Sequence, residues 1–338
     1  MAERAMEPTR AARSESADDI VLPFGTVRSR ISGRIVRLGP AVDKVLDAHD
    51  YPDPVRATLG EALALTALLG HPIKPGGRLI LQTKTDGPLG FLVVHYDAPG
   101  AMRGYASFDR TKVAALAASG TVEQGDLLGN GHLAMTIDPG AHLPSHQGIV
   151  ALDGGSLTDA AHTYFRQSEQ LPTFIRLAVA RQMIGGVANG TSPWKWRAGG
   201  LILQHVPRLG GDPHPDESPE ERDARLHGED DDDWLRVATL AATVEGHELI
   251  DPTLSPERLL LRLFHEEGVR VGDETPVAAR CRCSRQRIAG FLGGFSAEEL
   301  NDMREDDGAV TVTCEFCSTK YRFEDDELPS KQSGFKSD

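Results

Sequence analysis

All four cysteines of this 338-residue chain lie close to its C-terminal end. They form a C-x-C pair and, thirty residues later, a C-x-x-C pair: Cys281, Cys283, Cys314 and Cys317. Four sulfurs in two close pairs can ligate one tetrahedral zinc ion, and the same sulfurs can also form two local disulfides. A reducing cytosol keeps thiols reduced, which favours metal binding over permanent disulfides. We therefore expect one zinc ion per chain, bound by all four cysteines in the reduced protein.

Loss of this metal is expected to unfold the C-terminal piece. A structural zinc contributes about 10–16 kcal/mol to the folding of small peptides near neutral pH. A piece of about 60 residues seldom has more than about 3–5 kcal/mol of stability of its own. Because the contribution of the metal is the larger of the two, the C-terminal piece should lose its fold when it loses zinc.

Four arginines surround the C-x-C pair: Arg280, Arg282, Arg285 and Arg287. Positive charge near a thiol favours the thiolate, which is the form that oxidants attack. A solvated arginine face is an alternative interpretation that the residues leave open. A C-x-C disulfide closes a very small ring and should be strained, and strained bridges are the labile ones. The sequence therefore permits an unfolding switch driven by oxidation.

Residues 20–210 are predicted to be one α+β domain with a mainly antiparallel sheet. Several short segments alternate apolar and polar residues between turn signals, which is typical of paired strands, and others have apolar residues at helical spacing. The predicted strands lie within 20–38 and at 79–83, 91–96, 133–137, 148–152, 174–183 and 201–205, and the predicted helices at 41–49, 53–69 and 157–167. Residues 1–19 are expected to be a disordered tail.

An acidic, proline-rich segment separates this domain from a leucine-rich one. Residues 212–233 carry eleven acidic residues and two arginines, which predicts a solvated linker or inserted loop. Helical spacing then predicts one helix over 234–249 and a second that Ser255 caps, with Pro256 at its first position. The whole stretch 211–274 is predicted to be an acidic insert and a metastable helical linker. Its apolar face can be buried only against a neighbouring domain.

A small zinc-binding domain is predicted over residues 275–328, with a disordered tail at 329–338. Within it, Ser296–Glu299 has the pattern of a capping box that opens a short helix. Apolar and β-branched residues at 310–313 and 320–323 predict two strands on either side of the C-x-x-C pair.

The composition argues against several classes of protein. Hydrophobic residues make up 40% of the chain and charged residues 25%, as in an ordinary globular protein. No run of about 18 apolar residues predicts a membrane span, and the N-terminus lacks the apolar region of a secretory signal, so we expect a cytoplasmic protein. A net charge of −14 disfavours nucleic-acid binding, which depends on neutralising phosphates. The nucleotide-binding and hydrolase motifs that we sought are absent from the sequence, and no enzymatic activity is expected.

Further motifs run in order along residues 20–325. They are His49-Asp-Tyr-Pro52, Asp86-Gly-Pro88, Met102-Arg-Gly104, Gly129-Asn-Gly131, Tyr164-Phe165, Ser168-Glu-Gln-Leu-Pro172 and Leu263-Phe-His-Glu-Glu267. Together with Cys281-Arg-Cys283 and Cys314-Glu-Phe-Cys317, they give the chain a resemblance to the heat-shock protein 33 family of redox-regulated holdase chaperones. The resemblance covers most of the chain, which makes it more specific than a cysteine pattern alone.

The resemblance implies an ATP-independent holdase whose reduced, zinc-bound form is inactive. It implies that oxidation pairs Cys281 with Cys283 and Cys314 with Cys317 and that zinc leaves. The C-terminal domain and the linker would then unfold and expose apolar surface. This surface would bind unfolding client proteins and prevent their aggregation, and the oxidised form would be a homodimer.

Two segments look longer than in typical members of that family. One is the acidic stretch 212–233, and the other is the 189–199 loop with Trp194 and Trp196. Both could change how the linker docks. The two tryptophans could contact a client, or they could pack a hairpin tip onto its own sheet.

Two other functions compete with the chaperone hypothesis. A thiol-disulfide oxidoreductase would use the cysteines catalytically, but no thioredoxin-like βαβ pattern surrounds them, and zinc needs all four. A zinc-ribbon nucleic-acid binder is disfavoured by the acidic charge. His265, beside Glu266 and Glu267, could be a zinc ligand or a base. Since four cysteines are sufficient for the metal, we expect a histidine on a helix surface.

Overall fold

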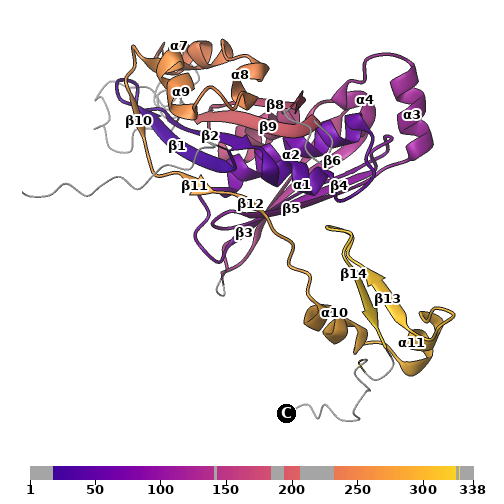
Figure 1. The fold of residues 1–338 in the computed structure, drawn as a ribbon. Helices are drawn as coiled ribbons and strands as arrows, with labels where there is room; N and C mark the ends of the chain where they lie inside the picture. The colour runs from indigo at the N-terminus through magenta and orange to yellow at the C-terminus, as the bar shows by residue number, and fades with distance from the viewer. Residues whose placement is uncertain (1–17, 141–142, 184–193, 206–231, 325–326, 328–338) are drawn as a thin grey trace, which may run out of the picture.

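Two sheets with a helix between them make up the N-terminal part of the chain (Figure 1). The computed structural model describes residues 18–140, 143–183, 194–205, 232–324 and 327. The first sheet has the order β10-β1-β2-β9-β8, with β11 also on β1, and the second has the order β12-β5-β4-β3-β6-β7. Their long strands are β1 Ile20–Thr26, β2 Ser32–Leu38, β3 Arg78–Thr85, β4 Phe91–Asp97, β5 Ala101–Ser107, β6 Asn130–Asp138, β7 His146–Asp153, β8 Thr173–Met183 and β9 Trp194–Gln204. All of these neighbours pair antiparallel, as predicted, and the α+β fold class is confirmed.

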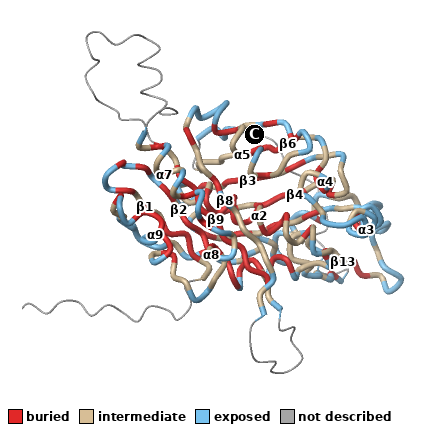
Figure 2. The backbone as a smooth tube through the Cα atoms, turned by 90° about the horizontal axis from the view of Figure 1, so that it is seen from above, coloured by how far each residue is buried: buried red, intermediate tan, exposed pale blue. Residues whose placement is uncertain are grey.

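The helix between the sheets is α2, Asp53–Gly70, which contacts strands of both (Figure 2). Residues 62–68 of this helix are buried on every side because it has a sheet on each face, and Leu59, Leu63 and Leu68 are each at most 1% exposed. Glycines on the strands let the backbones approach. A Cβ at Gly200 would lie 3.0 Å from the Leu68 side chain. The side chains of α2 and those on the facing sides of both sheets therefore form one apolar core.

The predicted linker covers the outer face of the first sheet with three helices. They are α7 Asp232–Ala242, α8 Gly246–Ile250 and α9 Pro256–Phe264. Their buried side chains form a second apolar cluster with Leu22, Phe24 and Ile35 of the sheet. The expectation that this segment buries its apolar face against its neighbour is confirmed. The single helix predicted over 234–249 is wrong, because Glu245 has extended backbone and opens α8 with a capping box of its own.

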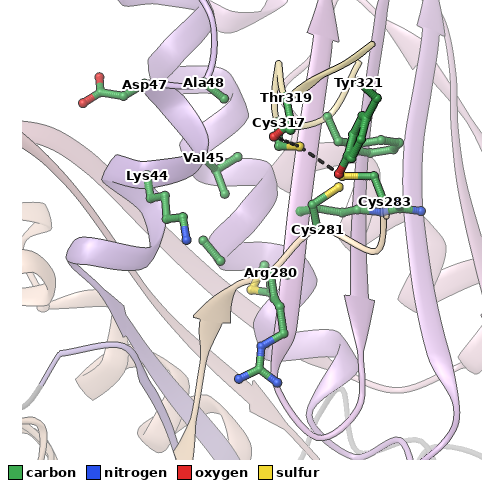
Figure 3. A pocket seen from close by; sticks show the side chains of 14 residues that line it. Lys44, Val45, Asp47, Ala48, Arg280, Cys281, Cys283, Cys317, Thr319 and Tyr321 are labelled. Carbon is green, nitrogen blue, oxygen red and sulfur yellow. Dashed lines mark hydrogen bonds between the residues drawn. The ribbon is translucent and has the colours of Figure 1, made fainter. Parts of the chain in front are cut away.

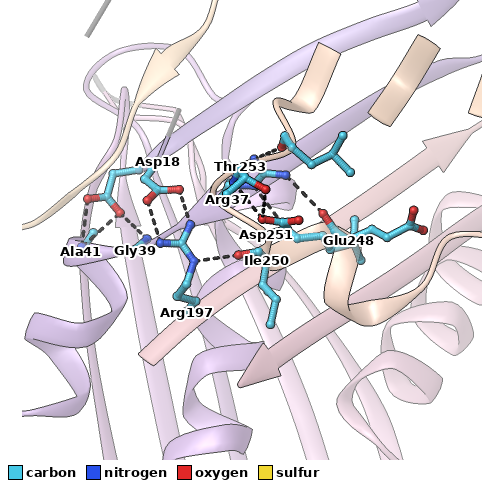
Figure 4. A network of polar contacts seen from close by, with 12 residues as sticks. Asp18, Arg37, Gly39, Ala41, Arg197, Glu248, Ile250, Asp251 and Thr253 are labelled. Carbon is cyan, nitrogen blue, oxygen red and sulfur yellow. Dashed lines mark hydrogen bonds and ion pairs between the residues drawn. The ribbon is translucent and has the colours of Figure 1, made fainter. Parts of the chain in front are cut away.

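Two buried arginines of the first sheet bind the backbone of the linker (Figure 4). Arg37 on β2 is fully buried and donates hydrogen bonds to three linker carbonyl oxygens: those of Glu248, Leu249 and Leu254. Arg197 on β9 donates from Nε to the Ile250 carbonyl at 2.7 Å and pairs with Asp18. The carbonyls at the end of a helix have no partner within the helix, and these guanidinium groups supply the missing donors for α8.

An edge-strand segment connects the linker to the cysteines. Here β10 Val269–Val271 and β11 Thr275–Pro276 pair with β1 of the first sheet. Directly afterwards, β12 Ala278–Ala279 pairs in parallel with β5 of the second sheet. The segment therefore crosses from one sheet to the other just before Cys281. The division predicted at residue 275 stays a prediction.

The C-terminal part is small. It contains α10 Arg285–Leu292, α11 Ala297–Asp302, β13 Val310–Thr313 and β14 Lys320–Phe323. The capping box at Ser296–Glu299 and both strands are confirmed. The buried side chains of its apolar cluster are Leu292, Leu300, Val310 and Phe323. So few buried groups give this part little stability of its own.

Several elements were not predicted or differ from the prediction. The strand β5 and the helices α3 Arg110–Ala118 and α4 Gln124–Leu128 were missed. The helix predicted over 41–49 is α1 Pro40–Leu46, and the one over 157–167 is α5 Leu157–Tyr164 continued by the π-helical turn η1 Phe165–Glu169.

The predicted loop with two tryptophans is wrong from Trp194 onward, since β9 begins there. The side chain of Trp196 is buried in the core, whereas Trp194 is exposed. The folded chain can therefore offer Trp194 to a client but not Trp196. Most of the acidic stretch 212–233, residues 1–17 and the predicted tail at 329–338 lie outside the described residues. The tail predicted over 1–19 is wrong at its last two residues, because Asp18 pairs with Arg197 and Asp19 accepts backbone hydrogen bonds from Gly39 and Ala41. Among the described helices, none is both long and apolar enough to cross a membrane.

Candidate metal centre

The sulfur atoms of the four cysteines come together in one cluster. All four Sγ atoms lie within 4.8 Å of one another. The shortest approaches join one pair to the other, at 3.7 Å between Cys281 and Cys314 and 3.3 Å between Cys283 and Cys317. A tetrahedron of sulfurs with metal–sulfur bonds of about 2.3 Å has edges of about 3.8 Å. The cluster therefore fits a single metal ion, and a donor set of four sulfurs suits zinc.

Two chain segments position these sulfurs. The C-x-C pair lies on the chain between β12 and α10, and the C-x-x-C pair lies in the turn between β13 and β14. Hydrogen bonds from Cys314 N to Thr319 O (3.0 Å) and from Ser318 N to Cys314 O (2.8 Å) close that turn. Ser318 has a left-handed backbone, with φ of 54°. The turn brings both of its sulfurs to the C-x-C segment.

The environments of the sulfurs differ. Tyr321 on β14 donates its hydroxyl to Cys283 Sγ at 3.2 Å. Burial is the main cause that raises the pKa of Cys283 to about 12. Burial acts in the same direction on Cys317, but hydrogen bonding to the Thr319 hydroxyl and backbone outweighs it and lowers the pKa of Cys317 to about 7. The Cys317 thiol is therefore readily ionised, and the thiolate is the form that binds metals and reacts with oxidants.

The C-x-x-C turn docks on the N-terminal part of the chain. The ring of Phe316 stacks under Arg103 of β5, with 4.0 Å between Cζ and the ring centroid. Ser318 donates its hydroxyl to a carbonyl just beyond α1 at 2.6 Å. His49 Nε2 lies 2.7 Å from the carbonyl oxygen of Glu315. These contacts form a seat for the metal centre, and sequence reasoning did not predict it because its two sides are far apart in the chain.

The four arginines beside the C-x-C pair do not act as one group. Arg280 lines the cavity next to the cysteines, and its backbone N–H bonds to the Met102 carbonyl of β5 at 2.8 Å. The other three bond elsewhere: Arg282 to Asp97 (3.3 Å), Arg285 to Glu327 (2.5 Å) and Arg287 to the Arg282 carbonyl (3.1 Å). Of the two interpretations that the sequence left open, a cationic fringe beside the sulfurs is supported for Arg280, which lines the same cavity.

His265 does not join the cluster. It caps the C-terminal end of α9, and its side chain is 65% exposed. Among the described residues, the group that could bind a metal consists of the four cysteines. The prediction of a histidine on a helix surface is confirmed.

Comparison with known proteins agrees with this architecture. The family model described as Hsp33 protein matches residues 19–324. The chain belongs to the Hsp33 family. The 33 kDa chaperonin of Caulobacter vibrioides (strain NA1000 / CB15N) is 45% identical over 309 residues, which are 91% of this chain and 95% of that relative. The 33 kDa chaperonin of Ectopseudomonas mendocina (strain ymp) is 38% identical over 297 residues, covering 87% and 88%.

A solved structure shares the fold. The crystal structure of the 33 kDa chaperonin (heat shock protein 33 homolog) from Thermotoga maritima matches with a TM-score of 0.70 and 20% sequence identity. The match covers 92% of this chain and 96% of that chain. Membership of the Hsp33 family confirms the resemblance drawn from the motifs and supports a chaperone function. Two of those motifs, around His49 and Arg103, lie at the seat of the metal centre.

Proposed function

We propose that this protein is a redox-regulated, ATP-independent holdase chaperone, inactive when it is reduced and zinc-bound. Family membership supports the chaperone function. The observation that carries the redox part is the cluster of four sulfurs within 4.8 Å of one another. Zinc bound to four thiolates supplies the stability that the few buried side chains of the C-terminal part do not.

Oxidation acts on the two cysteine pairs. Each pair gives two electrons to the oxidant, loses its protons or its bond to the metal, and forms one disulfide. We propose the pairs Cys281–Cys283 and Cys314–Cys317. A disulfide sulfur is no longer a thiolate ligand, so the oxidised site does not retain zinc. The C-terminal part then unfolds because its own core is too small to keep it folded.

Unfolding passes to the linker through the edge-strand segment that precedes the cysteines. The backbone bond from Arg280 to Met102 and the pairs of β12, β11 and β10 lie in order between the cysteines and α9. Loss of these bonds frees the linker helices, which carry the buried Leu259, Leu260 and Phe264. The linker and the outer face of the first sheet would then present apolar surface to unfolding clients.

The proposal also covers the oligomeric state, the partners and the location of the protein. Exposed apolar surface favours self-association, so the oxidised form is proposed to be a homodimer. The acidic charge makes nucleic acid an unsuitable partner, and neither a membrane partner nor an enzymatic activity is part of the proposal. A redox switch of this kind requires a compartment that is normally reducing, which is the cytoplasm.

Simultaneous measurement of zinc release and chaperone activity tests the proposal. Reduced full-length protein is treated with hypochlorite, or with peroxide at mild heat, in the presence of a chromogenic chelator. Light scattering from a thermally unfolding client is followed in parallel, and peptide mapping identifies the disulfides. We expect one zinc per chain to be released as scattering is suppressed, with both effects reversed by reductant and zinc.

Other results would contradict this scheme in part or in full. Zinc that stays bound, or that leaves without suppression of scattering, would make the metal merely structural. Disulfides that join Cys281 to Cys314 and Cys283 to Cys317 would refute the proposed pairing. Catalytic turnover of a small disulfide substrate would favour an oxidoreductase.

A further inference from the structure

A cavity of about 480 Å³ lies between α1, β5 and the cysteine cluster (Figure 3). The side chains of Cys281, Cys283 and Cys317 line it. A small molecule in this cavity would therefore be next to the sulfurs. The proposed redox switch requires an electrophile to reach these sulfurs while the chain is still folded, and the cavity offers that access.

Three cationic side chains line the same cavity. Lys44 projects from α1, Arg103 from β5 and Arg280 from the segment before the C-x-C pair. Within the described part of the chain, no ion pair joins any of the three to a carboxylate. Lys44 and Arg280 have exposed side chains, so they can meet a solute at the mouth of the cavity.

Arg103 has an unused donor. Its Nη2 lies 3.0 Å from His95 Nδ1, and its guanidinium covers the ring of Phe316. Burial, together with the charges of Arg103 and Arg78, lowers the pKa of His95 to about 4, so the imidazole is neutral and accepts this bond. The Nε–H of Arg103 is buried and has no hydrogen-bond partner. Because solvent does not reach this N–H, Arg103 acts on a solute in the cavity through the charge of its guanidinium.

The acidic residue that lines the cavity is already paired with a cation. Asp47, which lines it, pairs with Arg56 at 2.7 Å. Asp97 pairs with Arg78 and lies 3.3 Å from Arg282. The three cations that line the cavity therefore outweigh the two negative charges that zinc bound by four thiolates would carry, in a chain whose net charge is −14.

We propose that this cavity is an electropositive access site that selects small anionic thiol-reactive molecules. Such molecules are electrophiles that carry a carboxylate, a sulfonate or a comparable oxyanion. The proposal deepens the redox function above and rests on it. The positive charges of Lys44, Arg103 and Arg280 would attract the oxyanion and raise the local concentration of anions next to the sulfurs.

The reaction in the cavity is a substitution at sulfur. A cysteine thiolate attacks the sulfenyl sulfur of a thiosulfonate, and a new S–S bond forms between the cysteine and the reagent. The bond to the sulfonyl group breaks, and sulfinate leaves with the electron pair. The cysteine sulfur is thereby oxidised and the reagent reduced. A modified sulfur is not a thiolate ligand, so the modification is read out as zinc release.

A pair of reagents with opposite charge tests the selection. Sulfonatoethyl methanethiosulfonate is the anion and trimethylammonioethyl methanethiosulfonate the cation. Rates of zinc release and of cysteine labelling by mass spectrometry are measured on the zinc-loaded, reduced full chain. Each rate is divided by the rate of the same reagent with a small neutral thiol. After this normalisation, we expect the anionic reagent to react about ten times faster than the cationic reagent, despite the acidic net charge.

Matched variants identify the cause. In Lys44→Gln/Arg280→Gln the ratio of the anionic to the cationic rate should fall to one or below, and it should also fall as salt is added to the wild type. The control Lys112→Gln/Arg270→Gln removes the same charge from exposed positions on α3 and β10 and should keep the wild-type ratio. Both pairs carry exposed side chains, so the variants are expected to fold.

The outcomes separate this inference from the proposed function. A wild-type ratio at or below one, or an equal fall in the control variant, would overturn the access site. If zinc release and chaperone activity still follow oxidation in that case, the redox switch stands without it. If neither reagent modifies the cysteines of the folded chain, the cavity is not an access route, and the inference falls.

Discussion

Removal of the Arg37 guanidinium should release the linker from the first sheet without any oxidant. Arg37→Met keeps an unbranched apolar stem but removes the guanidinium that donates to Glu248, Leu249 and Leu254 (Figure 4). These carbonyls lie at and beyond the end of α8, where no helical N–H can replace the arginine. The variant leaves three buried or half-buried acceptors without a partner, which is unfavourable for the docked linker.

The size of the effect follows from these bonds. A charge-assisted hydrogen bond contributes about 1.5–3 kcal/mol, and the three share a single guanidinium. We therefore expect docking to weaken by about 3 kcal/mol, which corresponds to roughly 150-fold in the docking equilibrium. Local opening governs amide exchange, so exchange of the amides in 246–264 should accelerate by a similar factor.

Hydrogen exchange measured by mass spectrometry on the reduced, zinc-bound chain is the assay. Arg34→Met is the matched control, since Arg34 lies on the same strand but bonds to Gln204 within the sheet. The Arg37 variant should show partial suppression of client aggregation before oxidation, and the control should not. Unchanged exchange in 246–264 of Arg37→Met would refute the reasoning, as would equal acceleration in the control.

Three further predictions concern the metal centre and the linker. Removal of zinc with a chelator and reductant should abolish protection in residues 284–323 but leave the strands of the first core protected, because the two apolar clusters are separate. Tyr321→Phe removes the hydrogen bond to Cys283 and should weaken zinc binding by about tenfold, measured by competition with a chelator. Leu263→Ala, at a side chain that is 4% exposed, should destabilise linker docking by about 2–4 kcal/mol in denaturant unfolding followed by the fluorescence of Trp234.

Specific results would contradict these three predictions. Loss of protection in β3 to β6 on zinc removal would show that the metal centre and the first core fold as one unit. Zinc affinity equal to wild type in Tyr321→Phe would mean that the hydroxyl does not support the sulfur. For Leu263→Ala, the control is Leu261→Ala on the same helix, whose side chain is 59% exposed. Equal destabilisation by both variants would point to lost helix propensity rather than lost packing.

Local signals explain what could be predicted. The capping box at Ser296–Glu299 and the strands around the C-x-x-C pair depend on residues a few positions apart, so their patterns were sufficient. The break before α8 was also present as a local signal, since Glu245 and Glu248 form a capping box. Apolar spacing over 234–249 concealed it, because the two short helices present their apolar residues to the same sheet.

Non-local contacts explain what was missed. Nothing in the chain around Phe316 indicates that it lies under Arg103, more than two hundred residues earlier. Trp196 was placed in a loop, and its burial depends on β2, with which its strand also pairs, and on the first core, all of which are distant in the chain. Such positions are decided by how the sheets stack, which no short window of sequence contains.

By itself, the sequence indicated a donor set of four sulfurs and a segment whose apolar face needs a neighbour to cover it. Four sulfurs in two close pairs can converge from local turns, and a leucine-rich segment cannot bury its apolar face alone. Only the tertiary structure decided which surface covers that face, and that Arg37 and Arg197 bind the end of α8. It also decided which cations surround the sulfurs. The reason is that ligand spacing and periodicity are properties of neighbouring residues, whereas docking and electrostatic surroundings depend on segments that meet only in the fold.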